Sequence, residues 1–151
     1  MVFQDAAGAL QRIRSVGKVA ELQQLLDHAS IDGRLDIAHT RWATHGPPNQ
    51  INAHPHTAGK VALVHNGIIE NYKALKVQLG KKGHTFQSDT DSEVLAHLVE
   101  EFYEGDLTGA VQRALGVVEG AYGIAVVSSR DPQKIVAARK GSPLLLGIGK
   151  D

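Results

Sequence analysis

Three short polar segments hold the residues best suited to chemistry. They are residues 39–46, with the sequence HTRWATHG, residues 65–67, with HNG, and residues 89–91, with DTD. Each is expected to lie where a strand ends or a helix begins. Strand ends hold side chains rigidly, while the following loops let a ligand reach them. We therefore take these three segments as the candidate site.

Their residue types suit a small polar ligand with charges at both ends. The Arg41 guanidinium can hold a carboxylate through two parallel hydrogen bonds, and Asp91, at a helix start, can accept hydrogen bonds from an ammonium. Together they would hold the two ends of a free amino acid. The Asn66 side chain beside the backbone N–H of Gly67 offers two neutral donors, the composition of an oxyanion hole.

Structural explanations for the same residues stay open. Arg41 could pair with a structural aspartate such as Asp36. Asn66 and Gly67 could form only a turn, because Asn-Gly is a common hairpin signal. Asp91 could be an acid that the helix dipole favours in a first turn.

Several histidines also raise the question of a metal. His54 and His56 stand close together, but no recognised ligand spacing surrounds them. For His39 and His65, hydrogen bonds that hold the backbone of loops at strand ends are the better explanation. We expect no metal and no cofactor.

The elements that must position these segments follow from periodicity. Apolar and polar residues alternate over residues 10–16, and apolar residues recur at helical spacing over 18–29. The other expected strands are 36–42, 61–64, 121–129, 134–139 and 143–148, with a long loop over 43–60. Further helices are expected around residues 72–79, after a capping box at 90–93, and over 107–118. The pattern predicts an α+β domain with sheet packed on sheet and helices outside. Gly67 is expected to allow a turn where the strand at 61–64 stops.

Composition restricts the class of protein. The 151 residues suit one domain, with 42% hydrophobic and 21% charged residues. Sixteen basic residues balance sixteen acidic ones, so we expect neither nucleic-acid nor membrane binding. No apolar run is long enough to span a bilayer, and the first residues do not resemble a signal peptide. With no cysteine, a cytoplasmic protein is the default expectation.

The motifs HTRWATHG, NAHPH, HNGIIEN, SDTDSE, GAYG and GSPL resemble, in order and spacing, a known family. This family consists of the class II glutamine amidotransferase domains of the glutamine–fructose-6-phosphate aminotransferase (isomerizing) branch. The resemblance runs from about residue 10 to the C-terminus. It implies a four-layer αββα sandwich of the N-terminal-nucleophile hydrolase type, which agrees with the predicted layers.

The resemblance also implies roles for individual residues. Arg41 would bind the α-carboxylate of glutamine and Asp91 its α-ammonium, while Asn66 and Gly67 would form the oxyanion hole. Other residues of the octet would lie at the same pocket: Trp42, associated with the route by which ammonia leaves, and Thr44 and His45.

One departure from the family concerns its nucleophile. That nucleophile is an N-terminal cysteine whose own α-amine acts as base. This sequence begins Met1-Val2 and contains no cysteine. We therefore expect residues 1–151 to be a partial domain without the leading strand, the next helix, the cysteine and the sugar-phosphate isomerase domains. A fragment or a misplaced start is the favoured origin. Natural loss of catalysis, or a nucleophile supplied in trans, are the alternatives.

The expected function has two levels. The parent protein would hydrolyse glutamine to glutamate and ammonia, and the ammonia would convert fructose 6-phosphate to glucosamine 6-phosphate. The chain as given would be inactive, and the alternative is a non-catalytic module that binds glutamine or glutamate. Its partners would be glutamine and the parent's isomerase domains, and any homodimer would form through the parent. Loss of a strand would also leave unpaired backbone groups, which predicts weak stability.

Overall fold

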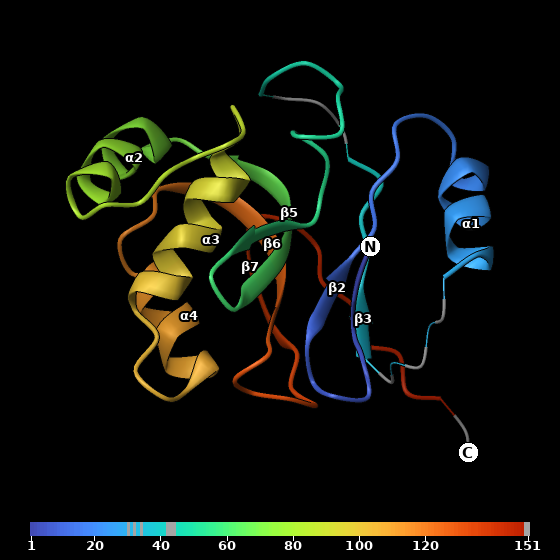
Figure 1. Ribbon diagram of the computed structural model, residues 1–151. Coiled ribbons are helices and arrows are strands. Elements are labelled where there is room, and N and C mark those ends of the chain that lie inside the picture. Colours follow the sequence, from blue (N-terminus) through green and yellow to red (C-terminus); the bar gives the residue numbers. More distant parts are fainter. Residues whose placement is uncertain (30, 32, 34, 42–44, 150–151) are drawn as a thin grey trace.

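Two antiparallel β-sheets face each other and carry helices on their outer sides (Figure 1). The structure is a computed structural model that describes residues 1–29, 31, 33, 35–41 and 45–149. One sheet has three strands in the order β2-β1-β3, and the other has four in the order β4-β5-β6-β7. The predicted α+β class is confirmed by this arrangement.

The elements follow one another along the chain in the order β1, β2, α1, β3, β4, β5, α2, α3, α4, β6 and β7. The strands are β1 (Val2–Gln4), β2 (Leu10–Arg12), β3 (Leu35–Ile37), β4 (His56–Ala58), β5 (Val61–Ile69), β6 (Gly120–Ser128) and β7 (Val136–Lys140). The helices are α1 (Val19–Asp27), α2 (Tyr72–Lys81), α3 (Asp91–Glu101) and α4 (Leu107–Leu115).

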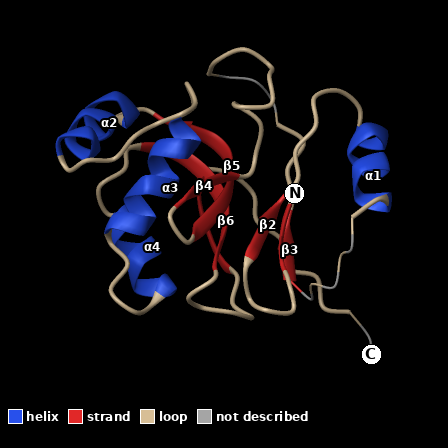
Figure 2. Cartoon of the chain, in the orientation of Figure 1, coloured by secondary structure: helices blue, strands red, loops and turns tan. Residues whose placement is uncertain are grey.

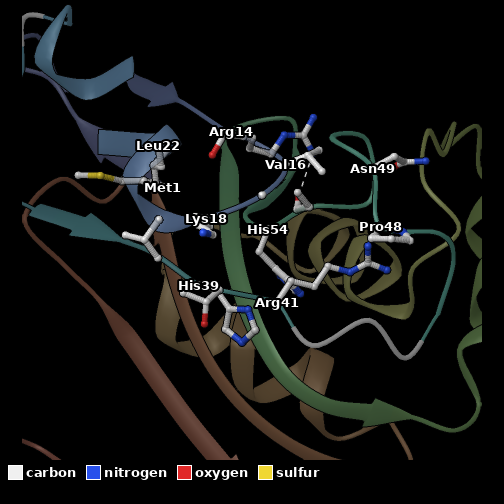
Figure 3. A pocket seen from close by; sticks show the side chains of 15 residues that line it. Met1, Arg14, Val16, Lys18, Leu22, His39, Arg41, Pro48, Asn49 and His54 are labelled. Atoms are coloured by element: carbon white, nitrogen blue, oxygen red, sulfur yellow. Dashed lines mark hydrogen bonds between the residues drawn. The ribbon is translucent and has the colours of Figure 1, made fainter. Parts of the chain in front are cut away.

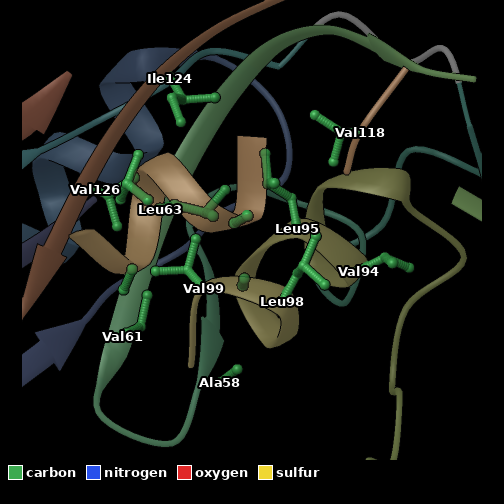
Figure 4. Packing of buried hydrophobic residues seen from close by; sticks show 14 of the residues in the cluster. Ala58, Val61, Leu63, Val94, Leu95, Leu98, Val99, Val118, Ile124 and Val126 are labelled. Carbon is green, nitrogen blue, oxygen red and sulfur yellow. The ribbon is translucent and has the colours of Figure 1, made fainter. Parts of the chain in front are cut away.

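Strand β5 divides its side chains between two hydrophobic cores. Val61 and Leu63 point to the larger core, where α3 and α4 pack on the four-stranded sheet (Figure 4). Ala62 and Val64 point the other way, into a smaller cluster that joins the two sheets through Val2 of β1 and its neighbours. Successive strand residues face opposite sides, so a continuous apolar run fits a strand that is covered on both faces.

The first turn of α3 is fixed by its cap. The Thr90 side chain accepts a hydrogen bond from the Glu93 backbone N–H at 3.2 Å, as the capping box predicts. The second hydrogen bond of the capping box, in which the glutamate side chain accepts from the backbone N–H of Thr90, does not form. The Glu93 carboxylate accepts from the backbone N–H groups of Gln87 and Ser88 instead. Glu93 therefore binds the segment between α2 and α3 to the first turn of α3.

Helix α1 lies on the outer side of the three-stranded sheet (Figure 2). The predicted helix is present, and its apolar residues recur at helical spacing. None of its residues is buried, however, and Val19 is 64% exposed. Among the described residues, this helix is therefore held much less firmly than α3.

Several predicted strand boundaries were wrong. The strands expected over 10–16 and 36–42 are only three residues long, as β2 and β3. No strand forms over 143–148, where Leu145 and Leu146 are 93% and 90% exposed. An apolar run becomes a strand only when another strand is available to pair with it, and none of the described strands pairs with 143–148.

Two strands lay in segments for which no strand was predicted. β1 pairs with both β2 and β3, and β4 lies inside the expected loop over 43–60 and pairs with β5. Each has only three residues, too few to show a period. The predicted turn at Gly67 was also wrong, because β5 continues through it to Ile69 and stays paired with β6.

Candidate functional site

The predicted site residues that the structure describes line one cavity of about 230 Å³. It lies between the loop after β3, the end of β5 and the start of α3. The site residues on its wall are Arg41, His45, Asn66, Gly67 and Asp91, and they are joined by His39, His54, His65, Ile68, Thr90 and Ser92. Trp42 and Thr44 lie outside the described residues.

The Arg41 guanidinium is held by its own loop. It donates hydrogen bonds to the backbone carbonyls of His45, of Gly46 at 3.1 Å and of Pro47 at 3.0 Å. Among the described residues it forms no ion pair, with Asp36 or any other carboxylate. Burial lowers the pKa of Arg41 and the charge of Asp91 raises it, so the two charges interact across the cavity.

The carboxylate of Asp91 is buried at the start of α3, only 3% exposed. Its Oδ2 accepts a hydrogen bond from the backbone N–H of Ile69 at 2.8 Å, which fixes α3 to the end of β5. Its Oδ1 lies 3.8 Å from His45 Nδ1. The carboxylate thus has one oxygen held by the backbone and another directed to the cavity wall formed by the loop after β3.

Asn66 and Gly67 are adjacent in β5, and the strand brings both to the cavity. Gly67 has φ +142°, and an added β-carbon would come within 2.1 Å of the Ala121 carbonyl oxygen. Only glycine fits such a backbone without strain. The carbonyl of Asn66 accepts a hydrogen bond from the Ser142 hydroxyl at 3.3 Å, which holds this part of the strand from the other side.

Three ring nitrogens at this cavity are buried and have no hydrogen-bond partner among the residues that the structure describes. They are His39 Nδ1, His54 Nδ1 and His65 Nε2. Burial lowers the pKa of all three histidines and so favours the neutral form of each ring. An unpaired polar atom in a protein interior costs about 1–3 kcal/mol, and a polar ligand or ordered water would remove that cost.

A second cavity, of about 230 Å³, shares His39, Arg41 and His54 with the first, and Figure 3 shows the residues that line it. Its far wall includes Leu22 from α1 and Lys18 just before that helix. The shared residues separate the two spaces, so the candidate site is next to a cavity that residues of α1 help to line.

Comparison with known proteins identifies the family. The sequence pattern described as "Glutamine amidotransferase domain" matches residues 39–148. The chain belongs to this family. It is 54% identical to a glutamine–fructose-6-phosphate aminotransferase (isomerizing) of Chlorobaculum tepidum, over 94% of this chain and 25% of that protein. It is 53% identical to the protein of the same name from Pseudomonas aeruginosa, over 96% of this chain and 24% of that protein. The chain spans about a quarter of the length of these relatives.

Solved structures support the same fold for this glutamine amidotransferase domain. A glutamine phosphoribosylpyrophosphate amidotransferase from B. subtilis superposes with a TM-score of 0.71 at 27% identity, over 91% of this chain and 30% of that one. A class II glutamine aminotransferase domain protein from Silicibacter pomeroyi gives 0.63 at 20% identity, over 95% and 70%. The predicted fold of the N-terminal-nucleophile type is confirmed by these neighbours.

Sequence reasoning gave no role to one residue that shapes the glutamine amidotransferase site. Asn52 is 1% exposed, donates to the Pro47 carbonyl at 3.1 Å and accepts from the backbone N–H of Asp89 at 3.0 Å. It joins the octet's loop to the segment before α3. Its place at the head of the NAHPH motif was the available signal.

Histidine clusters in this glutamine amidotransferase domain do not suggest a metal. Among the described residues, no group of three or more histidine, aspartate or glutamate side chains is arranged to hold a metal ion. None of the described helices is long and apolar enough to cross a membrane.

Proposed function

We propose that the 230 Å³ cavity of this domain binds glutamine for a glutaminase reaction. The arrangement of Arg41 and Asp91 carries the proposal, because a cation and a buried carboxylate lie on the walls of one cavity. Arg41 would hold the α-carboxylate and Asp91 the α-ammonium, with His45 beside them. Trp42 and Thr44 stay proposed members of the same pocket from the sequence alone.

The side-chain amide of glutamine would then reach Asn66 and Gly67. The Asn66 amide and the Gly67 backbone N–H would donate to the oxygen that gains negative charge when a thiolate attacks the amide carbon. The C–N bond breaks as the leaving nitrogen takes up the proton that the thiol gave to the α-amine base, so that ammonia leaves. Water then attacks the γ-glutamyl thioester, which releases glutamate and restores the thiol. In a parent like the relatives named above, the ammonia would convert fructose 6-phosphate to glucosamine 6-phosphate in isomerase domains.

These 151 residues contain no cysteine, so they hold no thiol for this reaction. We propose that residues 1–151 alone bind glutamine without hydrolysing it. The same observation favours a second candidate, a non-catalytic module that binds glutamine or glutamate. A cytoplasmic location and a parent chain with isomerase domains remain predictions.

Calorimetric titration with glutamine tests the pocket. We expect a saturable isotherm for the chain and at least about tenfold weaker binding for Asp91→Asn, which keeps the shape but loses the charge. Asp36→Asn is the matched control and should bind like the original chain, because Asp36 is exposed on β3. No heat of binding at millimolar glutamine, or equal binding by Asp91→Asn, would contradict the proposal.

Ammonia release distinguishes the two candidates. Purified residues 1–151 should release no ammonia from glutamine. Ammonia release that is lost in Asp91→Asn would overturn the proposal that these residues alone do not hydrolyse glutamine. In the full-length parent, glutamine-dependent ammonia release that requires Asp91 supports the glutaminase. Glutamine binding without release by the parent supports the binding module.

A further inference from the structure

A third cavity, of about 240 Å³ and lined largely by polar residues, shares no lining residue with the cavity proposed above for glutamine, the glutamine pocket. We call it the arginine cavity. Polar side chains from three segments form much of its wall: Arg12, Arg14, His56, Thr57, Glu93 and His97. No step of the proposed glutaminase reaction uses Arg12, Arg14 or His97.

Two guanidinium groups line this cavity, and no described carboxylate forms an ion pair with either. Arg12 donates to the Thr57 hydroxyl at 2.7 Å. Arg14 uses one nitrogen, Nη1, to donate to the carbonyls of Ile51 and Ala53 at 3.0 and 2.9 Å. A guanidinium has five N–H donors, so most donors of both arginines are unused by described residues. Neither arginine forms an ion pair with a described carboxylate.

The carboxylate on this wall is already occupied by hydrogen bonds. Glu93 accepts from the Gln87 backbone N–H at 2.9 Å, and from the Ser88 backbone N–H at 2.7 Å and hydroxyl at 2.8 Å. Its charge still acts on the arginines, since it raises the pKa of Arg12 and Arg14 while burial lowers both. Arg12 further lowers the pKa of Arg14, as expected for neighbouring like charges. Two cations therefore face one anion across the cavity.

We propose that the arginine cavity is a binding site for a phosphate group. Guanidinium groups match the geometry of a phosphate's oxygens, and each can donate two parallel hydrogen bonds to them. One added anion would neutralise the excess positive charge and give the unused donors acceptors. The Thr57 hydroxyl and the rings of His56 and His97 supply further polar groups on the wall.

The site is separate from the glutamine pocket but in contact with it. His56 belongs to the wall of the arginine cavity, and its Nε2 lies 3.2 Å from the Thr90 hydroxyl, which lines the glutamine pocket. The phosphate group could belong to inorganic phosphate or to a small phosphate monoester such as a hexose 6-phosphate. Both offer the same oxygens to the arginines, and a cavity of this size leaves room for part of a sugar.

Titration of residues 1–151 with inorganic phosphate tests the site, at constant ionic strength in chloride and without glutamine. We expect saturable binding, and at least about tenfold weaker binding in Arg12→Gln, because one charge-assisted contact is lost. The Arg12 side chain is partly exposed, and among the described residues its guanidinium donates a hydrogen bond only to Thr57, so this variant should fold. The matched control is Arg113→Gln on α4, which removes an equally charged, exposed arginine elsewhere and should leave phosphate binding unchanged.

Two further titrations complete the experiment. Arg14→Gln should weaken phosphate binding as Arg12→Gln does, with its fold checked by circular dichroism because Arg14 also holds the loop at 51–53.

A hexose 6-phosphate that binds at least as tightly as phosphate, and loses affinity in Arg12→Gln, assigns the site to phosphate monoesters. Tighter binding of inorganic phosphate assigns it to the free ion. Absence of saturable binding of either, or equal affinities in Arg12→Gln and Arg113→Gln, would overturn the proposal. Glutamine affinity is measured separately, so the two proposals can fail independently.

Discussion

At the scale of single residues, Gly67 gives the clearest prediction. Its backbone has φ +142° and its position leaves 2.1 Å between an added β-carbon and the Ala121 oxygen. Gly67→Ala should therefore lower the free energy of unfolding by at least about 2 kcal/mol and abolish glutamine binding. Urea unfolding and calorimetry measure the two effects.

The control for this change is Gly80→Ala in α2. A β-carbon there would meet nothing within 4 Å, and the helix would gain about 0.5 kcal/mol from the better helix former. If Gly67→Ala were as stable as Gly80→Ala, the close approach of β5 and β6 would not have the described geometry.

Buried histidines predict how stability depends on pH. Burial lowers the pKa of His56 from 6.5 to about 4, and it lowers that of His54 still further. Below pH 6.5 the unfolded chain therefore binds protons that the folded chain does not. Stability should be fully present above pH 6.5 and fall towards pH 4, by up to roughly 1.4 kcal/mol per pH unit for each histidine.

Urea unfolding at pH 7.5, 6.0 and 5.0 measures this dependence. His56→Gln should flatten the slope, whereas His28→Gln should leave it unchanged because His28 is exposed. Parallel slopes in the chain and in His56→Gln would show that His56 is not buried in its neutral form.

At the scale of elements, the N-terminus of α3 links stability to the site. Thr90 caps this helix and lies 3.2 Å from His56, while Asp106 caps α4 on the surface by accepting from Gly109 at 2.7 Å. Thr90→Ala and Asp106→Ala should each cost about 1–2 kcal/mol of unfolding free energy.

Only the first of these variants should weaken glutamine binding, because Asp91 follows Thr90 directly. Chemical unfolding and glutamine calorimetry on the same two samples separate the effects. Equal glutamine affinity in both variants would mean that the cap of α3 does not position Asp91.

Helices and strands were predicted where buried residues recur with a regular period along the sequence. They were missed where a short strand forms only because a neighbouring strand pairs with it. The apolar stripe of α3 and the run at Val61–Val64 were visible in the sequence because helix and strand periods were long enough. β1 and β4 were not predicted, since three residues show no period and each strand is defined by its neighbours.

At the scale of the whole molecule, two cores of different size hold the fold. Among the described residues, nineteen buried side chains form the cluster between the four-stranded sheet and its helices, and five form the cluster that joins the two sheets. Helix α1 adds no buried residue to either. Stability should therefore be uneven across the structure.

Native-state hydrogen exchange measures this difference. Amides of α1 and β1–β3 should exchange faster than those of β5, β6 and α3, by at least about tenfold. Uniform protection across both sheets would contradict the prediction, and would also count against the weak stability expected from the sequence.

The sequence by itself determined which residue types are available for a site. Arg41, Asn66, Gly67 and Asp91 were predicted from residue type, from their motifs and from the expected ends of strands, and their roles stay predictions. The cap at Thr90 placed the start of α3, because a capping box is a local pattern that needs no distant partner.

Only the tertiary structure decided how these residues meet. It brought Arg41, Asn66 and Asp91 to one cavity, placed around it three buried histidine nitrogens that no described residue bonds, and set Arg12 and Arg14 beside the arginine cavity. It also continued β5 through Gly67, where the sequence had suggested a turn. The physical reason is that these features depend on strand pairing and on packing between segments far apart in the chain, which no local pattern contains.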